Sequence, residues 1–425
     1  MRYISSIIVL VLIIVIIAII VGIFYVHNVL SNKFISITIY NTQNIPTPEP
    51  FQQDIAICNG NINIGPNFAY VNNATLFNQI DSDGQNVYFT TTYNSTPNIY
   101  SWYEGQLNYN KVTCDVWWIK LPNGIPASSN VTIYMNIGPN IVNYYQQYYP
   151  YVGTNAQVIG TMQYDNGQDV FIAYGYFDNT FDGWSGYMYF GVSGPIASSN
   201  GIEMLSGWCN QGTYILPPNN GNIPKIPLIV EEAWYDEGII YHYGKPSYSN
   251  WIFVNADSNV ISLFGNTSQQ IHIIGSFYTP TSNSSTFAQF DYYTGFTNLG
   301  SAITNITFGL SNIGLNVTYF PKSGGTFYSY LIVNSSYAQA GYYNYSFNQV
   351  WAPLTLLDTY NINYNNYTYY NLNYNPFQYG TLEISAGTDG YGPIPSACEN
   401  SYQYVQWVVA RAYPPNGVMP LIYIS

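Results

Sequence analysis

The chain has 425 residues, of which 47% are hydrophobic but only 7% are charged, and its 21 acidic and 8 basic side chains give a net charge of −13. This hydrophobic content predicts a folded body, whereas a typical soluble protein carries about 25% charged residues. The basic residues are few and scattered singly, so no patch can neutralise phosphates, which argues against nucleic acid as a partner.

The shortage of charge includes lysine, of which the sequence has only six. Carboxylates whose pKa is depressed in the folded state lose their stabilising effect as the pH falls through that pKa. A body with few such groups has little to lose in acid. We therefore expect an acidic exterior as the working environment, such as that of an acidophilic archaeon or of a virus that infects one.

Residues 7–26 form an uncharged apolar run of 20 residues. A helix of this length crosses the roughly 30 Å hydrocarbon core of a bilayer. The apolar core of a signal peptide is shorter, about 7–15 residues, and small residues follow it at the cleavage site. The run therefore predicts an uncleaved transmembrane anchor over residues 1–32, with the lipid bilayer as a partner. We expect a single-pass membrane protein whose body lies outside the cytoplasm, on a cell or virion surface.

Sequons and cysteines agree with an exported body. Ten Asn-x-Ser/Thr sequons are candidate glycosylation sites, at Asn73, Asn94, Asn130, Asn266, Asn283, Asn305, Asn316, Asn334, Asn344 and Asn366. Four cysteines allow three pairings, and an oxidising exterior lets disulfides persist. We expect one bridge within each half of the chain, among Cys58, Cys114, Cys209 and Cys398.

Beyond residue 33 the sequence predicts an all-β fold. Val131, Ile133 and Met135 alternate with polar residues, and this period of two turns one strand face inward. Trp117 and Trp118 must point to opposite faces of a strand, one into the core and one toward a neighbouring layer or solvent. The stretch 361–375, almost wholly Asn and Tyr, fits either a strand pair or an irregular loop. Similar short runs between turn-forming clusters lie at Ile35–Tyr40, Val87–Tyr93, Val112–Leu121, Val170–Phe177, Trp251–Val254, Ile271–Phe277, Phe327–Val333 and Tyr404–Ala410.

Six short segments in the first part of the body occur in a characteristic order. They are Ile35-Ser-Ile-Thr-Ile-Tyr-Asn, Val87-Tyr-Phe-Thr, Tyr100-Ser-Trp-Tyr-Glu, Val116-Trp-Trp-Ile-Lys-Leu-Pro, Ile125-Pro-Ala-Ser-Ser-Asn and Thr132-Ile-Tyr-Met-Asn-Ile-Gly. Together they resemble the uncharacterised exported domain-of-unknown-function family 2341. That family has no settled activity, so the resemblance implies architecture rather than function.

The rest of the chain resembles the concanavalin A-like, laminin-G-like jelly roll that commonly follows this family. It opens near Phe177-Asp-Asn-Thr-Phe-Asp-Gly-Trp and closes with Tyr404-Val-Gln-Trp-Val-Val-Ala-Arg-Ala-Tyr-Pro. Gln406 stands where family members often carry an acidic residue. The expected organisation is two β-sandwich or jelly-roll domains, 33–150 and 151–425, behind one transmembrane helix at 1–32.

A dense acidic cluster runs from Glu231 to Glu237. Within it Glu232, Trp234 and Asp236 would share one strand face, which makes them candidate ligand contacts. Glycoside hydrolases need two carboxyl groups about 5–9.5 Å apart, so hydrolysis through Glu232 or Asp236 is one alternative. A solvated turn or a cation site is the simpler interpretation, and we expect no catalytic residue.

Calcium is the only cofactor that the sequence suggests. Asp178 and Asp182 are loop carboxylates of the kind that Ca²⁺ binds, at the predicted opening of the jelly roll. The pairs Asp81/Asp83 and Asp165/Asp169 are weaker candidates, since Asp-Gly pairs also simply form turns. Isolated histidines such as His242 and His272 are expected to be structural.

The abundant aromatic residues are compatible with several classes of function. With 47 tyrosines and nine tryptophans, many rings must be partly exposed, and exposed rings suit sugars, protein interfaces or self-assembly. The leading hypothesis is a non-catalytic binding or adhesion module for glycans or other surface proteins. The alternatives are a structural spike or coat protein of an archaeal virion, and a glycoside hydrolase.

Overall fold

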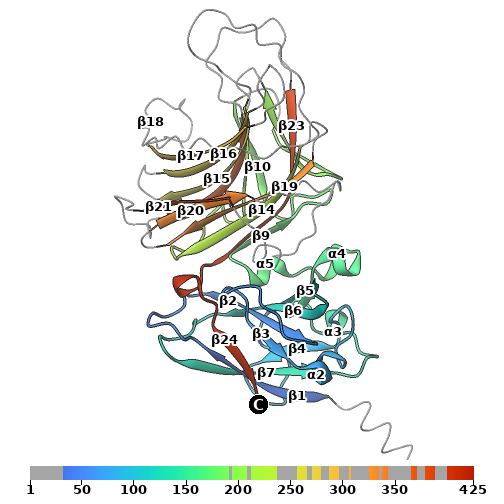
Figure 1. Ribbon diagram of the computed structural model, residues 1–425. Coiled ribbons are helices and arrows are strands. Elements are labelled where there is room, and N and C mark those ends of the chain that lie inside the picture. The colour runs from blue at the N-terminus through green and yellow to red at the C-terminus, as the bar shows by residue number, and fades with distance from the viewer. Residues whose placement is uncertain are drawn as a thin grey trace, which may run out of the picture.

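The computed structural model describes residues 32–190, 194–207, 212–236, 256–265, 270–278, 287–295, 306–307, 325–334, 337–342, 365–370, 379–387 and 400–425. The predicted span at 7–26 and the predicted strand at 251–254 lie outside these residues. Within the described part of the chain, no helix is long and apolar enough to cross a bilayer. The described secondary structure is mostly β-strand, as the sequence predicts (Figure 1).

Four sheets hold the described strands. The four-stranded sheet has the order β24 (Leu421–Ile424), β1 (Lys33–Tyr40), β7 (Asn130–Ile137), β4 (Val87–Thr90). The five-stranded sheet has the order β3 (Tyr70–Asn72), β2 (Phe51–Cys58), β6 (Val112–Leu121), β5 (Ser101–Tyr109), β8 (Val152–Thr154). These two sheets form the lower sandwich of Figure 1.

The upper sandwich is formed by the two larger sheets (Figure 1). The seven-stranded sheet has the order β10 (Ser185–Phe190), β13 (Gly212–Leu216), β22 (Tyr379–Gly387), β15 (Ala256–Gly265), β16 (Gln270–Tyr278), β17 (Phe287–Gly295), β18 (Ile306–Thr307). The eight-stranded sheet has the order β11 (Ile196–Ser198), β12 (Gly201–Gly207), β23 (Asn400–Ala412), β14 (Leu228–Asp236), β19 (Gly325–Val333), β20 (Tyr337–Tyr342), β21 (Asn365–Tyr370), and β9 (Ala173–Tyr176) also pairs with β23.

Short helical turns connect these strands, mostly between the two sandwiches. They are α2 (Ala74–Phe77), α3 (Tyr144–Tyr148), α4 (Ala156–Ile159), the 3₁₀ turn η1 (Met162–Tyr164), α5 (Gly167–Val170) and the 3₁₀ turn η3 (Pro415–Gly417). Asparagine side chains begin several of them; Asn143, for example, accepts a hydrogen bond from the Gln146 backbone amide. Such caps satisfy amides that a short helix cannot pair internally.

The core of the lower sandwich follows the predicted alternation. Ile37 of β1 and Ile133 of β7 are directly paired and fully buried, and they face Ile55 and Trp117 of the five-stranded sheet within one apolar cluster. Trp118 points to the opposite face of β6 and is also fully buried, because the upper sandwich covers it. The prediction for this tryptophan pair is therefore confirmed.

A disulfide joins Cys58 of β2 to Cys114 of β6, which are paired neighbours in the five-stranded sheet. This is the bridge expected within the first half of the chain. Cys209 and Cys398 lie outside the described residues, so the second bridge stays a prediction.

Two predicted strands are shorter in the structure. The strand predicted at Val87–Tyr93 ends at Thr90. The predicted strand at Val170–Phe177 is wrong at its start, because Val170 ends α5 and only Ala173–Tyr176 form a strand. The stretch 361–375 contains a strand, β21, paired with β20.

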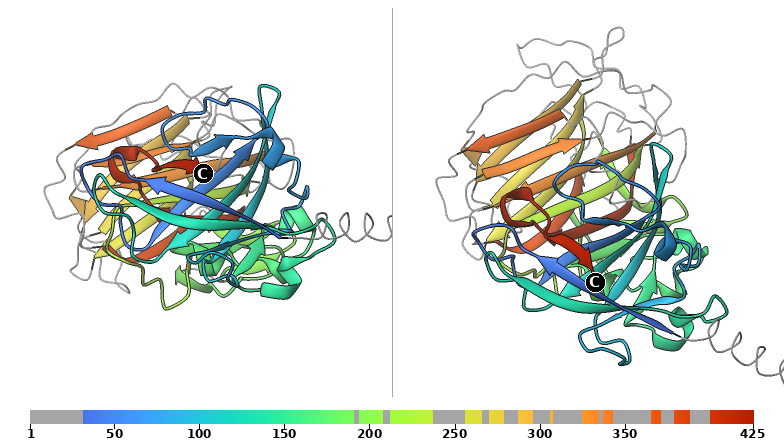
Figure 2. Two further views of the ribbon diagram at one scale, coloured as in Figure 1. Left: turned by 90° about the horizontal axis from the view of Figure 1, so that it is seen from below. Right: turned by 60° about the horizontal axis from the view of Figure 1, so that its bottom comes forward.

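The C-terminal strand β24 leaves the upper sandwich and pairs antiparallel with β1 (Figures 1 and 2). The last residues thus complete a sheet of the N-terminal half. The division at residue 150 and the concanavalin A-like assignment stay predictions.

Candidate functional site

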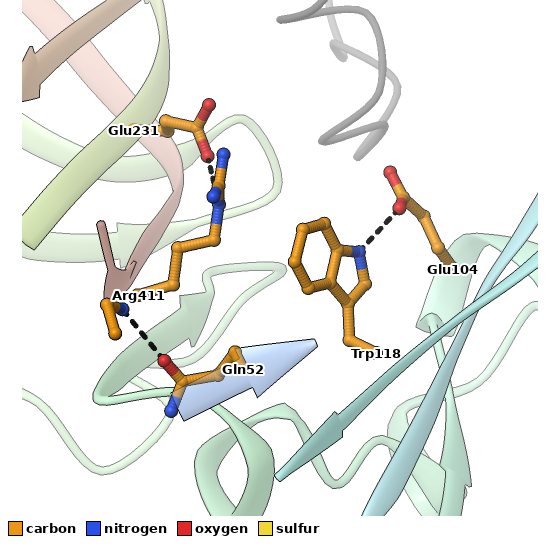
Figure 3. A network of polar contacts seen from close by, with 6 residues as sticks. Gln52, Glu104, Trp118, Glu231 and Arg411 are labelled. Carbon is orange, nitrogen blue, oxygen red and sulfur yellow. Dashed lines mark hydrogen bonds and ion pairs between the residues drawn. The ribbon is translucent and has the colours of Figure 1, made fainter. Parts of the chain in front are cut away.

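The two sandwiches meet where β14 and β23 approach the outer face of the five-stranded sheet (Figure 3). Arg411 of β23, one of only two arginines in the sequence, is 2% exposed there. Its Nε lies 3.4 Å from Oε2 of Glu231, and its guanidinium carbon lies 5.0 Å from the ring centroid of Trp118. The cation therefore has a carboxylate from its own sheet and an aromatic face from the other sandwich.

Trp118 extends this network into the lower sandwich. Its Nε1 donates a hydrogen bond of 2.7 Å to Oε2 of Glu104 (Figure 3). The β5–β6 register shifts between Tyr103 and Gly105, so Glu104 is the extra residue of a bulge. Bulges redirect a side chain out of the regular alternation, which explains how Glu104 reaches this tryptophan.

Gln52 joins the sandwiches at a second point. Its Oε1 accepts a 2.8 Å hydrogen bond from the Ala412 amide, and its Nε2 donates to the Val170 carbonyl at 3.2 Å. One fully buried side chain thus holds β2, β23 and α5 together. Buried amides stabilise only when both ends are satisfied, and here both are.

Buried carboxyl groups lie close to this junction. Asp54 of β2 is fully buried, and burial raises its pKa to about 7 against the opposing effects of the Ala69 amide and the Arg411 charge. Asp165, between the sandwiches, accepts hydrogen bonds from Trp102 Nε1 and Tyr174 Oη at 3.0 and 2.6 Å, and burial raises its pKa to about 7 as well.

A group of exposed and half-buried side chains, the junction platform, lies at the side of this contact and consists of Tyr100, Lys120, Tyr149, Tyr151 and Asp169. The rings of Tyr100 and Tyr151 stack with centroids 4.6 Å apart. Tyr149 and Tyr151 are 47% and 39% exposed. Lys120 Nζ donates to the Asp169 carbonyl at 2.8 Å.

Strand pairing positions the platform. The Ser101 amide donates to the Tyr151 carbonyl, and the Lys120 amide donates to the Tyr100 carbonyl. These bonds bring residues from β5, β6 and the start of β8 side by side. Burial, Tyr151 and the Asp169 carboxylate together raise the pKa of Tyr100, so its phenol stays neutral and able to donate. The platform thus offers aromatic faces, hydroxyl donors, one cation and one carboxylate within one patch.

The predicted calcium pair is committed to protein contacts. Asp182 Oδ2 accepts a hydrogen bond from the Tyr176 amide at 3.0 Å, and Asp178 Oδ1 accepts one from Asn179 Nδ2 at 2.7 Å. Among the residues that the structure describes, no group of three or more His, Cys, Asp or Glu side chains could hold a metal ion. Calcium binding by Asp178 and Asp182 stays a prediction.

The predicted ligand contacts on β14 are placed inside the protein. Glu232 and Trp234 are each about 1% exposed, and the β14–β23 register shifts between Ala233 and Trp234. A ligand at Glu232 would have to enter the upper sandwich. The side chain of Asp236 lies outside the described residues, as do the whole of Glu237 and His242, so the ligand contact stays a prediction.

Of the predicted glycosylation sites, Asn94 and Asn130 have exposed side chains. Asn94 sits in a turn at φ +56°, and Asn130 begins β7. The Oδ1 atom of Asn73 caps α2 by accepting from the Leu76 amide. Asn334 is partly exposed. The side chains of the remaining six sequon asparagines lie outside the described residues, and glycosylation of all ten stays a prediction.

Of the junction platform, sequence reasoning singled out only Asp169, and that residue as a calcium candidate. Tyr100 and Tyr151 are 51 positions apart in the chain, and only the parallel β5–β8 pairing brings them together. The one usable signal was Tyr149-Pro150-Tyr151, a local concentration of aromatic side chains around a proline.

No protein-family model matches the chain, and the resemblance to family 2341 stays a prediction. The chain is 31% identical over 223 residues to "Uncharacterized protein 562" of Sulfolobus islandicus rod-shaped virus 1. The match covers 49% of this chain and 34% of that protein, so the chain spans about a third of that relative's length. This similarity supports the expected origin in an archaeal virus.

Two solved structures resemble the chain weakly. One is the exoplasmic/lumenal domain of VIP36 in its Ca²⁺/Man3GlcNAc-bound form, with 8% identity and a TM-score of 0.33 over 56% of this chain and 88% of that one. The other is the enzymatically active domain of tailspike protein 2 of bacteriophage CBA120, with 12% identity and a TM-score of 0.28 over 55% of this chain and 29% of that one. TM-scores this low establish neither a shared fold nor a shared ligand.

Proposed function

We propose that the chain is a membrane-anchored surface protein that contacts glycans through the junction platform. Residues 7–26 hold the body on the outer side of a lipid bilayer, and the platform is the binding surface. The observation that carries the proposal is the stacked pair of half-buried Tyr100 and exposed Tyr151, with Lys120 and Asp169 beside it.

The chemistry of the platform favours a neutral sugar. Tyrosine combines an apolar ring with a polar hydroxyl, and it orders at low entropic cost because it has only two side-chain torsions. Lys120 and Asp169 supply one donor and one acceptor group without a net charge.

The junction network supports this role by fixing the platform. Binding residues held on rigid elements lose less entropy when a ligand binds. Lys120 and Trp118 lie on β6, and Asp169 lies on α5, whose last residue Val170 is bonded to Gln52. The same contacts that join the sandwiches therefore position the cation and the carboxylate.

Replacing Tyr151 with alanine should weaken glycan binding by about 10-fold or more, as expected for loss of a central aromatic contact. The test is an array of neutral mannose-, glucose- and galactose-terminated oligosaccharides, followed by measurement of Kd for the best ligand. Tyr187→Ala is the matched control, because Tyr187 is also 39% exposed and stacks on Tyr214 at 5.1 Å. No binding by the wild type, or equal loss in both variants, would contradict the proposal.

A second candidate, a structural component of an archaeal virion, is favoured by the similarity to the Sulfolobus virus protein. Glycan contact and a place in the virion surface are compatible. Mass spectrometry of purified virus particles distinguishes the locations, since a virion component co-purifies with the capsid proteins and a host-surface protein does not.

A further inference from the structure

One end of the four-stranded sheet lies a short tether away from the predicted membrane span. The span ends at Val26 and β1 begins at Lys33, with six residues between them. An extended chain covers at most about 3.6 Å per residue, so Lys33 lies within about 25 Å of the end of the span. Side chains exposed at this end of the four-stranded sheet therefore stay close to the bilayer surface.

The two most exposed large hydrophobic side chains in the described part of the chain gather at this end. Ile141 is 79% exposed and Tyr93 is 62% exposed. Ile141 lies four residues beyond Ile137, which pairs with Lys33 at the start of β1. The Tyr93 ring lies 5.2 Å from the ring of Phe34, the second residue of β1. Solvent exposure of such side chains is costly unless another apolar phase covers them.

The sheet face beside them carries no charge. Tyr134 of β7 packs against Tyr93 with ring centroids 5.6 Å apart. Further along the same outward face of β1, β7 and β24, the side chains are uncharged, namely Ser36, Thr38, Tyr40, Thr132, Leu421 and Tyr423. Lys33 at the corner donates to Gln79 Oε1 at 2.7 Å. The carboxylates of the adjoining loop, Asp81 and Asp83, accept hydrogen bonds from Gln85.

We propose that Phe34, Tyr93, Tyr134 and Ile141, the membrane edge, insert into the headgroup region of the bilayer that residues 7–26 span. Aromatic residues and lysine are the side chains that membrane interfaces favour, with the ring or aliphatic stem in the apolar layer and the polar end in water. The proposal rests on the anchor in the proposed function and adds that the body lies against the lipid on one defined edge. It requires the sequon at Asn94, next to Tyr93, to carry no glycan.

A second copy of the chain fits this edge less well. A stable protein interface takes about 20–30 residues on each side, and the membrane edge has four. The tether also keeps Lys33, at the corner of this edge, within about 25 Å of the end of the span at all times, whereas a second copy must diffuse to it. Lipid is therefore the occupant to test.

The test uses the full-length chain reconstituted into phosphatidylcholine vesicles whose acyl chains are brominated near the headgroup. Tyr93→Trp and Ile141→Trp each add a tryptophan whose emission bromine quenches on contact, and the wild type supplies the background of its own tryptophans. Tyr187→Trp, on β10 of the upper sandwich, is the control. Loss of the added emission at positions 93 and 141, but not at 187, is the expected result.

Vesicle flotation, measured on the same samples, separates the two proposals. Protein that does not float with the vesicles would overturn the anchor and the membrane edge together. Protein that floats but shows unquenched emission at positions 93 and 141 would overturn the membrane edge alone. Unquenched emission with cross-linking between Tyr93 residues of two copies would assign the edge to self-assembly instead.

Discussion

Replacing Arg411 with methionine is expected to lower the free energy of unfolding at neutral pH by about 3–5 kcal/mol, the usual cost of breaking a buried ion pair from one side. The substitution removes the cation that Glu231 faces and the charge above the Trp118 ring. Urea unfolding followed by tryptophan fluorescence measures the change.

The double variant Arg411→Met with Glu231→Leu is the informative companion. Buried ion pairs replaced on both sides by apolar residues of similar volume are often neutral or stabilising, so most of the lost stability should return. Lys225→Met, at an exposed position of the upper sandwich, is the control and should change stability by less than about 0.5 kcal/mol. A cost below about 1 kcal/mol for Arg411→Met would mean that the pair is solvated in solution.

Acidification from about pH 7.5 to about pH 4 is expected to stabilise the protein, opposite to ordinary acid denaturation. Burial raises the pKa of Asp54 to about 7 and that of Asp115 to about 6, from an ordinary value of 3.8. The folded state then binds more protons than the unfolded state between pH about 4 and about 7, so stability falls as pH rises through that window. At about 1.4 kcal/mol per pKa unit, Asp54 alone contributes on the order of 4 kcal/mol.

Thermal unfolding as a function of pH tests this, with Tm expected to rise steadily as the pH falls from 7.5 to 4. Asp54→Asn, which keeps the shape without the charge, should flatten the profile in that window. Asp178→Asn, at an exposed loop position, is the control for removing a surface carboxylate. A Tm that drops between pH 6 and pH 4 would contradict both the pKa shifts and the acidic environment inferred from composition.

The sequence predicted β6 as an apolar run, although both of its faces are buried. Alternation of apolar residues was sufficient to predict β1 and β7, because each has one face in the core and the pattern of period two is visible in the sequence. The same argument missed β2, Phe51–Cys58, in which all eight residues are buried. Gln52, Gln53 and Asp54 interrupt the apolar pattern. Segments distant in the chain bury them, with the Ala412 amide bonded to Gln52 and the Pro420 carbonyl bonded to Gln53. Strands that are covered on both faces lose the alternating pattern.

The junction and the platform could not be predicted for a related reason. Arg411 and Trp118 are nearly 300 positions apart, and the strand β24 that returns to β1 closes the chain over an even longer separation. Local sequence patterns carry no information about such pairings. What the sequence did indicate was the scarcity of cations, and the one arginine of the body proves to be the buried cation between the sandwiches.

Hydroxyl-radical footprinting of the full-length chain, with and without a saturating neutral oligosaccharide, tests the glycan-binding platform most directly. Oxidation rates of individual tyrosines report their solvent exposure, and Tyr93, Tyr149, Tyr151, Tyr187 and Tyr423 are all exposed in the free protein. The account predicts that the sugar protects Tyr149 and Tyr151 and leaves Tyr93, Tyr187 and Tyr423 unchanged. Protection at the other three tyrosines without protection of Tyr149 and Tyr151 would contradict it.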